Sequence, residues 1–107
     1  MELPAFERYR EEYLSENDFR DLQKQLISQP EIGSVIRGSG GLRKMRFADS
    51  RRHKGTRGGL RVIYFLWKSG NQIWLFTLYD KDEMDDLQDH ELMLLKNFLK
   101  YELEKRK

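Results

Sequence analysis

The 107-residue sequence contains no cysteine and only two histidines. The lack of cysteine excludes a disulfide framework, a thiolate nucleophile and a zinc site with cysteine ligands. No HExxH, EF-hand or complete P-loop pattern is present, and no carboxylate cluster lies on a recognisable scaffold. We therefore predict no metal and no cofactor. A chain without cysteine suits a reducing compartment, so we expect a cytoplasmic protein.

Long apolar runs are also missing. No stretch approaches the length of a membrane span, and the acidic, amphipathic start does not resemble a signal peptide. We expect no contact with membranes. Only 38% of the residues are hydrophobic, but two Trp, five Tyr and six Phe supply bulk for a core. The length fits a single domain over residues 1–107.

Acidic residues are scarce in the middle of the chain. Residues 1–31 carry a net charge of −4, residues 32–81 carry +9, and residues 82–107 carry −3. The total charge is only +2, although the central segment of the chain is strongly cationic. Its densest part reads GSGGLRKMRFADSRRHKGTRGGLRVIYF, in which glycine-flanked Arg and Lys alternate with strand-forming residues. This composition favours a phosphate-binding surface. The alternative is an ordinary solvated strand and loop.

Helical patterns occupy the two ends of the chain. Pro4 suits a first helical turn, and Phe6, Tyr9 and Tyr13 share one face. Ser15 and Asp18 form a variant capping box that opens a second helix, which ends before Pro30. Its predicted buried stripe is Phe19, Leu22, Leu26 and Ile27. A third helix is predicted from about Asp85, and its predicted stripe is Leu87, Leu94, Leu95, Phe98 and Leu99.

Strand patterns fill the middle. We predict strands over residues 42–48, 60–67 and 72–79, with glycine-rich loops at 31–42 and 49–59. The second strand is apolar on both faces, as in a central strand covered on both sides. The order of elements predicts an α+β fold: a small antiparallel sheet with two N-terminal helices and a C-terminal helix. We expect the helices to cover one face and leave the other partly open.

Three cations are expected to meet on the open face. Lys44 and Arg46 are two residues apart on a strand and so point the same way. Arg61 opens the next strand, after two glycines that allow close backbone approach. The three side chains match the oxygens and developing charge of one phosphate group. The alternative is a solvated strand face.

Further candidates surround these three. The residues predicted to bind a polyanion such as RNA are Arg43, Arg51, Arg52, His53, Lys54 and Arg57. For the loop that carries Lys54 and Arg57, the alternative is a mobile surface loop. The cluster expected to supply a proton donor or acceptor is Tyr79, Lys81, Asp82 and Glu83. Histidine titrates near neutrality, but the cationic neighbours of His53 in the sequence are expected to lower its pKa. His90 is expected to be exposed. Most of the strand aromatics are expected in the core, although stacking on bases is the alternative.

The segments GSGGLRKMRF, GTRGGLRVIYF and LFTLYDKDEMDDL resemble the HigB toxins of the RelE superfamily. The segments FERYREEYLSENDFRDLQKQL and PEIGSVIRG resemble the family's front end, so the resemblance spans the whole chain at consistent spacing. It departs from the family pattern at Thr56, where relatives often carry Lys, and at Asp82, where Asn is usual. The loop before Gly55 is also longer, and no tyrosine stands near Gln88, where RelE has its C-terminal one.

The resemblance implies a RelE-like, microbial-RNase-like fold and a ribosome-dependent endoribonuclease that cleaves mRNA. It implies a catalytic set of Lys44, Arg46, Arg61 and Lys81, with Lys54 and Arg57 on loop positions that bind RNA. The implied partners are the ribosome, mRNA and a HigA-like antitoxin of the helix-turn-helix class, with operator DNA contacted only through the antitoxin. The alternatives are a non-catalytic RNA- or ribosome-binding module, and an inactive toxin homologue acting in autorepression.

Overall fold

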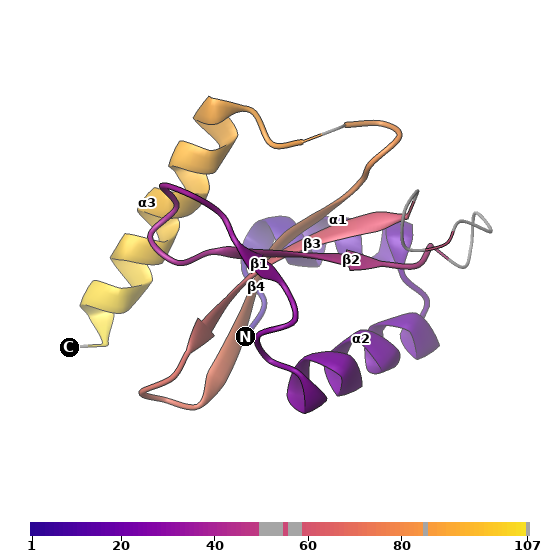
Figure 1. Cartoon of the computed structure of the whole chain (residues 1–107), viewed down its shortest axis with the longest axis horizontal. Helices are drawn as coiled ribbons and strands as arrows, with labels where there is room; N and C mark the ends of the chain where they lie inside the picture. Colours follow the sequence, from indigo (N-terminus) through magenta and orange to yellow (C-terminus); the bar gives the residue numbers. More distant parts are fainter. Residues whose placement is uncertain (50–54, 56–58, 85, 107) are drawn as a thin grey trace.

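The computed structural model describes residues 1–49, 55, 59–84 and 86–106. It is an α+β fold of three helices and a four-stranded antiparallel sheet (Figure 1). Helices α1 (Pro4–Tyr13) and α2 (Glu16–Ser28) precede the sheet, and α3 (Asp89–Lys105) follows it. In the described residues no helix is both long enough and apolar enough to cross a bilayer.

The sheet is a simple meander in which neighbouring strands follow one another in sequence. Its order is β1-β2-β3-β4, and all three pairings are antiparallel. The strands are β1 (Ser34–Val35), β2 (Arg43–Phe47), β3 (Leu60–Trp67) and β4 (Gln72–Asp80). The last three confirm the predicted strands to within a residue or so. The two-residue β1 lies in the segment predicted as a loop, because a strand this short leaves no alternating pattern to detect.

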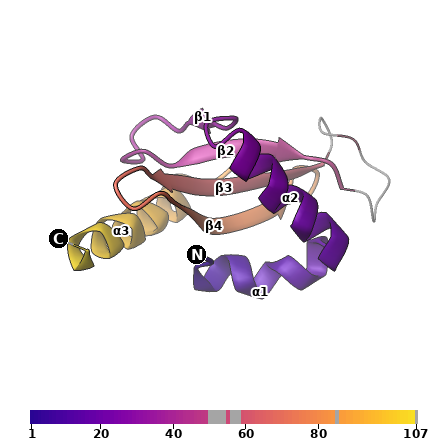
Figure 2. The same ribbon diagram turned by 90° about the horizontal axis from the view of Figure 1, so that it is seen from below.

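Two apolar clusters cover the two faces of the sheet. Helices α1 and α2 pack on the face of Met45 and Val62, with Phe6 and Leu22 at the centre of that cluster. Helix α3 packs through Leu99 on the opposite face. Figure 2 shows α1 and α2 on the near side of the sheet, with α3 reaching behind it. The expectation that all helices cover one face is therefore wrong, since α3 covers part of the second face.

Helix α2 begins as its sequence predicts. The Ser15 side chain accepts a hydrogen bond from the backbone N–H of Asp18, and the Asp18 carboxylate accepts one from the N–H of Ser15. This reciprocal pairing satisfies two backbone donors that a helix leaves without partners. The predicted stripe of α2 holds for Leu22 and Leu26, but Ile27 is 75% exposed. Ile27 therefore lies beside the buried stripe of α2 and outside the core.

Close backbone packing explains one glycine of the connection between β2 and β3. A Cβ atom on Gly59 would lie 2.5 Å from the carbonyl oxygen of Phe47 and 2.6 Å from that of Gly55. Both neighbours are backbone atoms, so no side-chain rotation relieves the clash. Gly59, two residues before Arg61, therefore lets the chain pass close to the end of β2.

Candidate functional site

The pairing register brings Arg46, Arg61 and Tyr79 into one row across three strands. Arg46 is the partner of Arg61 in the β2–β3 pair, and Arg61 is the partner of Tyr79 in the β3–β4 pair. Directly opposite residues project from the same face with their Cβ atoms about 5 Å apart. The predicted convergence of two arginines on one face is therefore present in the backbone register.

Lys44 belongs to the same face, one row further along. Its partner on β3 is Ile63, which packs in the cluster under α3. Met45 and Phe47 point the other way, toward α1 and α2. The predicted division of this strand, with cations on one side and apolar residues on the other, is confirmed. We call Lys44, Arg46, Arg61 and Tyr79 the sheet-end cluster.

A bulge in β4 places Tyr79 in this cluster. Ile63 pairs with Thr77 while Tyr64 pairs with Leu75, so Phe76 is an extra residue in β4. The extra residue shifts the alternation, and Phe76 and Tyr79, three apart, both face the α3 side. A regular strand would have turned Tyr79 toward α1 and α2.

The three cationic side chains differ in how deeply they are buried. Arg46 is exposed and Lys44 is half-buried, whereas Arg61 is only 5% exposed. One guanidinium nitrogen of Arg61 donates to the carbonyl oxygen of Leu60 at 3.2 Å. Arg61 is thus held by its surroundings, while Arg46 is presented to solvent. The sequence predicted a common face but not this difference in depth.

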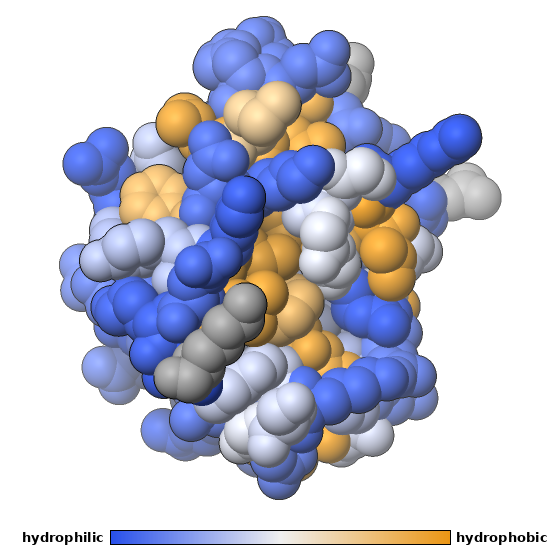
Figure 3. All heavy atoms as spheres, turned by 90° about the vertical axis from the view of Figure 1, so that its left-hand side faces the viewer, coloured by the Kyte–Doolittle hydropathy of each residue, from blue (hydrophilic) through white to orange (hydrophobic). Residues whose placement is uncertain are grey.

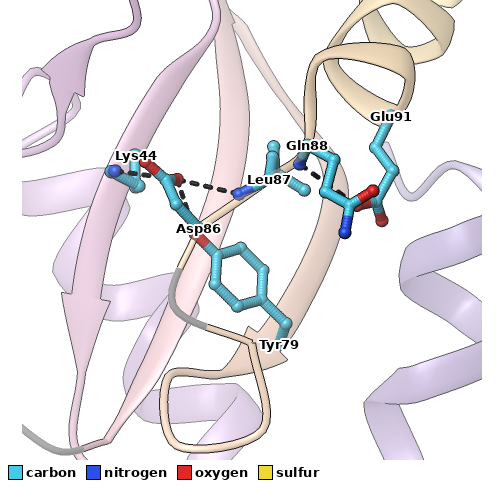
Figure 4. A network of polar contacts seen from close by, with 6 residues as sticks. All are labelled: Lys44, Tyr79, Asp86, Leu87, Gln88 and Glu91. Atoms are coloured by element: carbon cyan, nitrogen blue, oxygen red, sulfur yellow. Dashed lines mark hydrogen bonds and ion pairs between the residues drawn. The ribbon is translucent and has the colours of Figure 1, made fainter.

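Asp86 contacts the sheet-end cluster, and the sequence analysis did not predict this contact. Its Oδ1 atom lies 3.2 Å from Nζ of Lys44 and 3.3 Å from the hydroxyl of Tyr79 (Figure 4). The backbone N–H of Leu87 donates to the same oxygen at 2.9 Å. Asp86 is 42 positions from Lys44, and nothing in the local pattern around it predicts so distant a contact. The available signal was its place on the short link between β4, which ends in this cluster, and α3.

The pKa values of the two acid–base groups of this network, Tyr79 and Asp86, are shifted in opposite directions. Burial raises the pKa of Tyr79, and the negative charge of Asp86 raises it further. Burial alone would also raise the pKa of Asp86, but hydrogen bonds from Leu87 N–H and Lys44 outweigh it and hold that pKa below its usual value. At neutral pH Tyr79 is therefore a protonated hydroxyl and Asp86 an ionised carboxylate.

Lys81 and Arg43 have different places. Lys81 directly follows β4, at the end of the sheet where Arg61 is the second residue of β3. Its backbone N–H donates to the carbonyl oxygen of Gly59 at 3.2 Å. Arg43 is the partner of Tyr64 on β3, and its guanidinium donates to the carbonyl oxygens of Gly33 and Glu31. The structure does not bring Arg43 together with Lys44 and Arg46.

The remaining candidates divide in two. His90 is exposed in α3, as predicted, and Asp82 and Glu83 are exposed in the turn after β4. Within the described parts of the chain, no grouping of three or more His, Asp or Glu is arranged to hold a metal ion. Some predicted RNA-binding residues lie outside the described residues, namely Arg51, Arg52, His53, Lys54 and Arg57.

A search of protein-family models with this sequence finds none that matches.

Proposed function

We propose that the protein is an endoribonuclease that cleaves mRNA at the ribosome and belongs to the HigB toxins of the RelE superfamily. One observation carries the proposal: the register sets Arg46 directly opposite Arg61, with Lys44 on the same face. The two guanidinium groups and the ammonium group on one sheet face offer donors that match the oxygens of a phosphate group. The motif resemblance over the whole chain supports RNA as the source of that anion.

The proposed reaction is a transesterification within the RNA. The 2′-hydroxyl oxygen attacks the adjacent phosphorus, the bond from phosphorus to the 5′-oxygen breaks, and a 2′,3′-cyclic phosphate and a 5′-hydroxyl result. Arg61 stabilises the charge of the pentacoordinate phosphorus, and Lys44 and Arg46 orient the phosphate. The protonated hydroxyl of Tyr79 is a hydrogen-bond donor to a phosphate oxygen. Lys81, at the same sheet end, adds a further cation.

In this proposal the protein acts in the cytoplasm as the toxin of a toxin–antitoxin pair. The partner antitoxin is HigA-like, with a helix-turn-helix domain through which the pair contacts operator DNA.

A non-catalytic RNA- or ribosome-binding module is the second candidate, and the same network favours it. Tyr79 and Asp86 have pKa values shifted away from neutrality, Tyr79 upward and Asp86 downward. An efficient general base has a pKa near the working pH, so neither group suits that role. Such a module binds the phosphates through the same cations and leaves the RNA intact.

The deciding experiment is a cleavage assay on mRNA in a purified translation system, with and without ribosomes. We expect ribosome-dependent cuts with 2′,3′-cyclic phosphate ends. On a ribosome-free minimal substrate, where magnesium is not needed for ribosome integrity, slow cleavage is expected to continue in EDTA because the scheme uses cationic side chains in place of a metal. Binding without cleavage selects the second candidate, and activity restored only by one added transition metal contradicts the transesterification scheme.

Asp86 competes with the substrate for Lys44 in this proposal. Replacing Asp86 with asparagine removes the charge and keeps the shape, so the affinity for a short single-stranded RNA is expected to rise about two- to fivefold, the scale of an exposed ion pair. Fluorescence anisotropy measures the change. Glu104→Gln, on the exposed side of α3, is the matched control and leaves the affinity unchanged.

The gain from Asp86→Asn has a defined pH dependence. Because the pKa of Asp86 is lowered, the ion pair with Lys44 is complete above the ordinary carboxyl pKa of about 4 and is lost only as the pH falls through the lower native value. The gain is therefore expected to stay constant between about pH 5 and pH 8. A gain that declines through that range contradicts a carboxylate that is ionised across it.

A further inference from the structure

A groove runs between α1 and α3 on the side of the molecule away from α2. Its floor is Thr77, Leu78 and Tyr79 of β4, and its volume is about 510 Å³. Tyr9 lines it from α1 and Phe98 from α3. The groove therefore brings together two helices that lie at opposite ends of the sequence.

Large apolar side chains of α3 are left in solvent along this groove. Leu94 is 57% exposed and Phe98 is 49% exposed, and both line the groove. Tyr101 on the same helix is 61% exposed but does not line the groove. The spacing of four and three residues places the three side chains on one face of the helix. Figure 3, which views the molecule from the α3 side, shows apolar surface bordered by hydrophilic residues. A contiguous exposed patch of this kind is typical of a protein-binding surface.

The described residues that line the groove carry only negative charge. Among residues 1–49, 55, 59–84 and 86–106, the lining contains the carboxylates of Asp80, Glu83 and Glu91 and no Lys, Arg or His. The hydroxyl of Tyr13 donates to Glu83 at 3.0 Å, and the backbone N–H of Gln88 donates to Glu91 at 3.1 Å. In the described portions of the chain neither Glu83 nor Glu91 has a cationic partner. Each carboxylate keeps acceptor capacity for a further donor.

We propose that this groove is the docking site of a basic amphipathic segment from another protein. Large apolar residues of the segment cover Leu94, Phe98 and Tyr9, while its Lys or Arg side chains pair with Glu83 and Glu91. Burial of the apolar face supplies affinity, and the acidic border selects a cationic partner over an acidic one. The inference does not depend on RNA cleavage, and the groove adjoins the sheet-end cluster through the shared residue Tyr79.

The probes for the test are two fluorescein-labelled amphipathic peptides of about 18 residues, long enough for a stable helix. One combines Leu with Lys, and the other combines Leu with Glu in the same pattern. The Leu/Lys peptide is expected to bind the full chain saturably, and the Leu/Glu peptide at least about tenfold more weakly. Anisotropy titrations in moderate salt, with RNA absent, measure both affinities.

Four variants decide where the Leu/Lys peptide binds. Phe98→Asp and the double change Glu83→Lys with Glu91→Lys are each expected to weaken it about tenfold or more. The matched controls are Met93→Asp and Glu104→Lys, which are exposed on α3 but do not line the groove. Both controls leave the affinity unchanged. All the replaced side chains are partly or fully exposed, and circular dichroism verifies that each variant folds.

Three results overturn the proposal. The first is equal affinity for the two peptides, and the second is binding that the groove variants do not weaken. The third is a concentration-dependent dimer, seen by analytical ultracentrifugation, that Phe98→Asp abolishes, because the occupant is then a second copy of this chain. RNA cleavage by Glu83→Lys with Glu91→Lys is measured in parallel, so that failure of this proposal is distinguished from failure of the proposed ribonuclease activity.

Discussion

Replacing Arg61 with methionine is expected to lower the rate of RNA cleavage by about two to three orders of magnitude, the usual effect of removing one donor that stabilises transition-state charge. Arg61 pairs with Arg46 on one side and Tyr79 on the other, at the centre of the sheet-end cluster. Single-turnover cleavage of ribosome-bound mRNA measures the rate. Expression of the variant alone is expected to leave growth unaffected, and expression of the parent protein is expected to arrest it.

Methionine is chosen because Arg61 is buried. Because Arg61 is only 5% exposed, replacing it with alanine would leave a cavity as well as remove the charge. The loss of stability and the loss of the charge would then be confounded. Methionine fills much of the volume of the arginine stem. Arg43→Met is the matched control, since Arg43 contacts backbone carbonyls near β1 and lies apart from the cluster. An Arg61→Met protein that melts normally and cleaves at the parent rate rules out the assigned role.

Replacing Trp74 with alanine is expected to lower the free energy of unfolding by about 3–5 kcal/mol. Trp74 is fully buried between the sheet and α3, its ring lies 5.5 Å from that of Phe65 and 5.3 Å from that of Trp67, and the guanidinium of Arg106 lies 4.9 Å from its centroid. A small domain is stable by only about 5–15 kcal/mol, so the loss is a large share. Urea denaturation measures it.

Trp67→Ala is the control for this prediction. The same residue type is lost on the neighbouring strand, but Trp67 is only half-buried, so a markedly smaller loss is expected. Because Trp74 packs in the cluster under α3, its removal is also expected to release α3 from the sheet. Equal losses for the two variants would contradict the expectation that the deeper burial of Trp74 sets the size of the effect.

The sequence predicts most of the fold because its strong signals are local. The capping box at Ser15 and Asp18 acts within one helical turn, and the apolar run of β3 marks a strand covered on both sides. The α+β order follows from these elements. The position of α3 on the second face of the sheet depends on tertiary packing. The sequence of an amphipathic helix does not specify which face of a sheet the helix covers.

The errors on α3 come from the same limit. Leu94 and Phe98 fit the three- and four-residue spacing of the predicted stripe, yet both are about half exposed or more. Periodicity identifies an apolar face but does not distinguish a face that packs inside the chain from one that remains open. The helix also begins at Asp89 rather than about Asp85, and the residues released from it include Asp86.

For the site, strand alternation predicts which side Lys44 and Arg46 face. The opposition of Arg46 and Arg61 depends on register, which the sequence fixes only through the whole β2–β3 pairing. The position of Tyr79 depends on the bulge at Phe76, and Asp86 reaches the cluster only through the path of the link that follows β4. Such contacts arise from the folded topology, so residue types and spacing alone do not contain them.

The ion pair between Lys44 and Asp86 alters how the number of phosphate contacts is read from salt titrations. A free cation that takes up an RNA phosphate releases a bound salt ion from the RNA, which contributes about 0.7 to the slope of log affinity against log salt for a single strand. At Lys44 the phosphate also displaces an intramolecular carboxylate, which then gathers its own counterions from solution. The net release at this position is therefore smaller than for a free cation. A contact count taken from the slope would understate Lys44, and Asp86→Asn would steepen the slope by up to about 0.7.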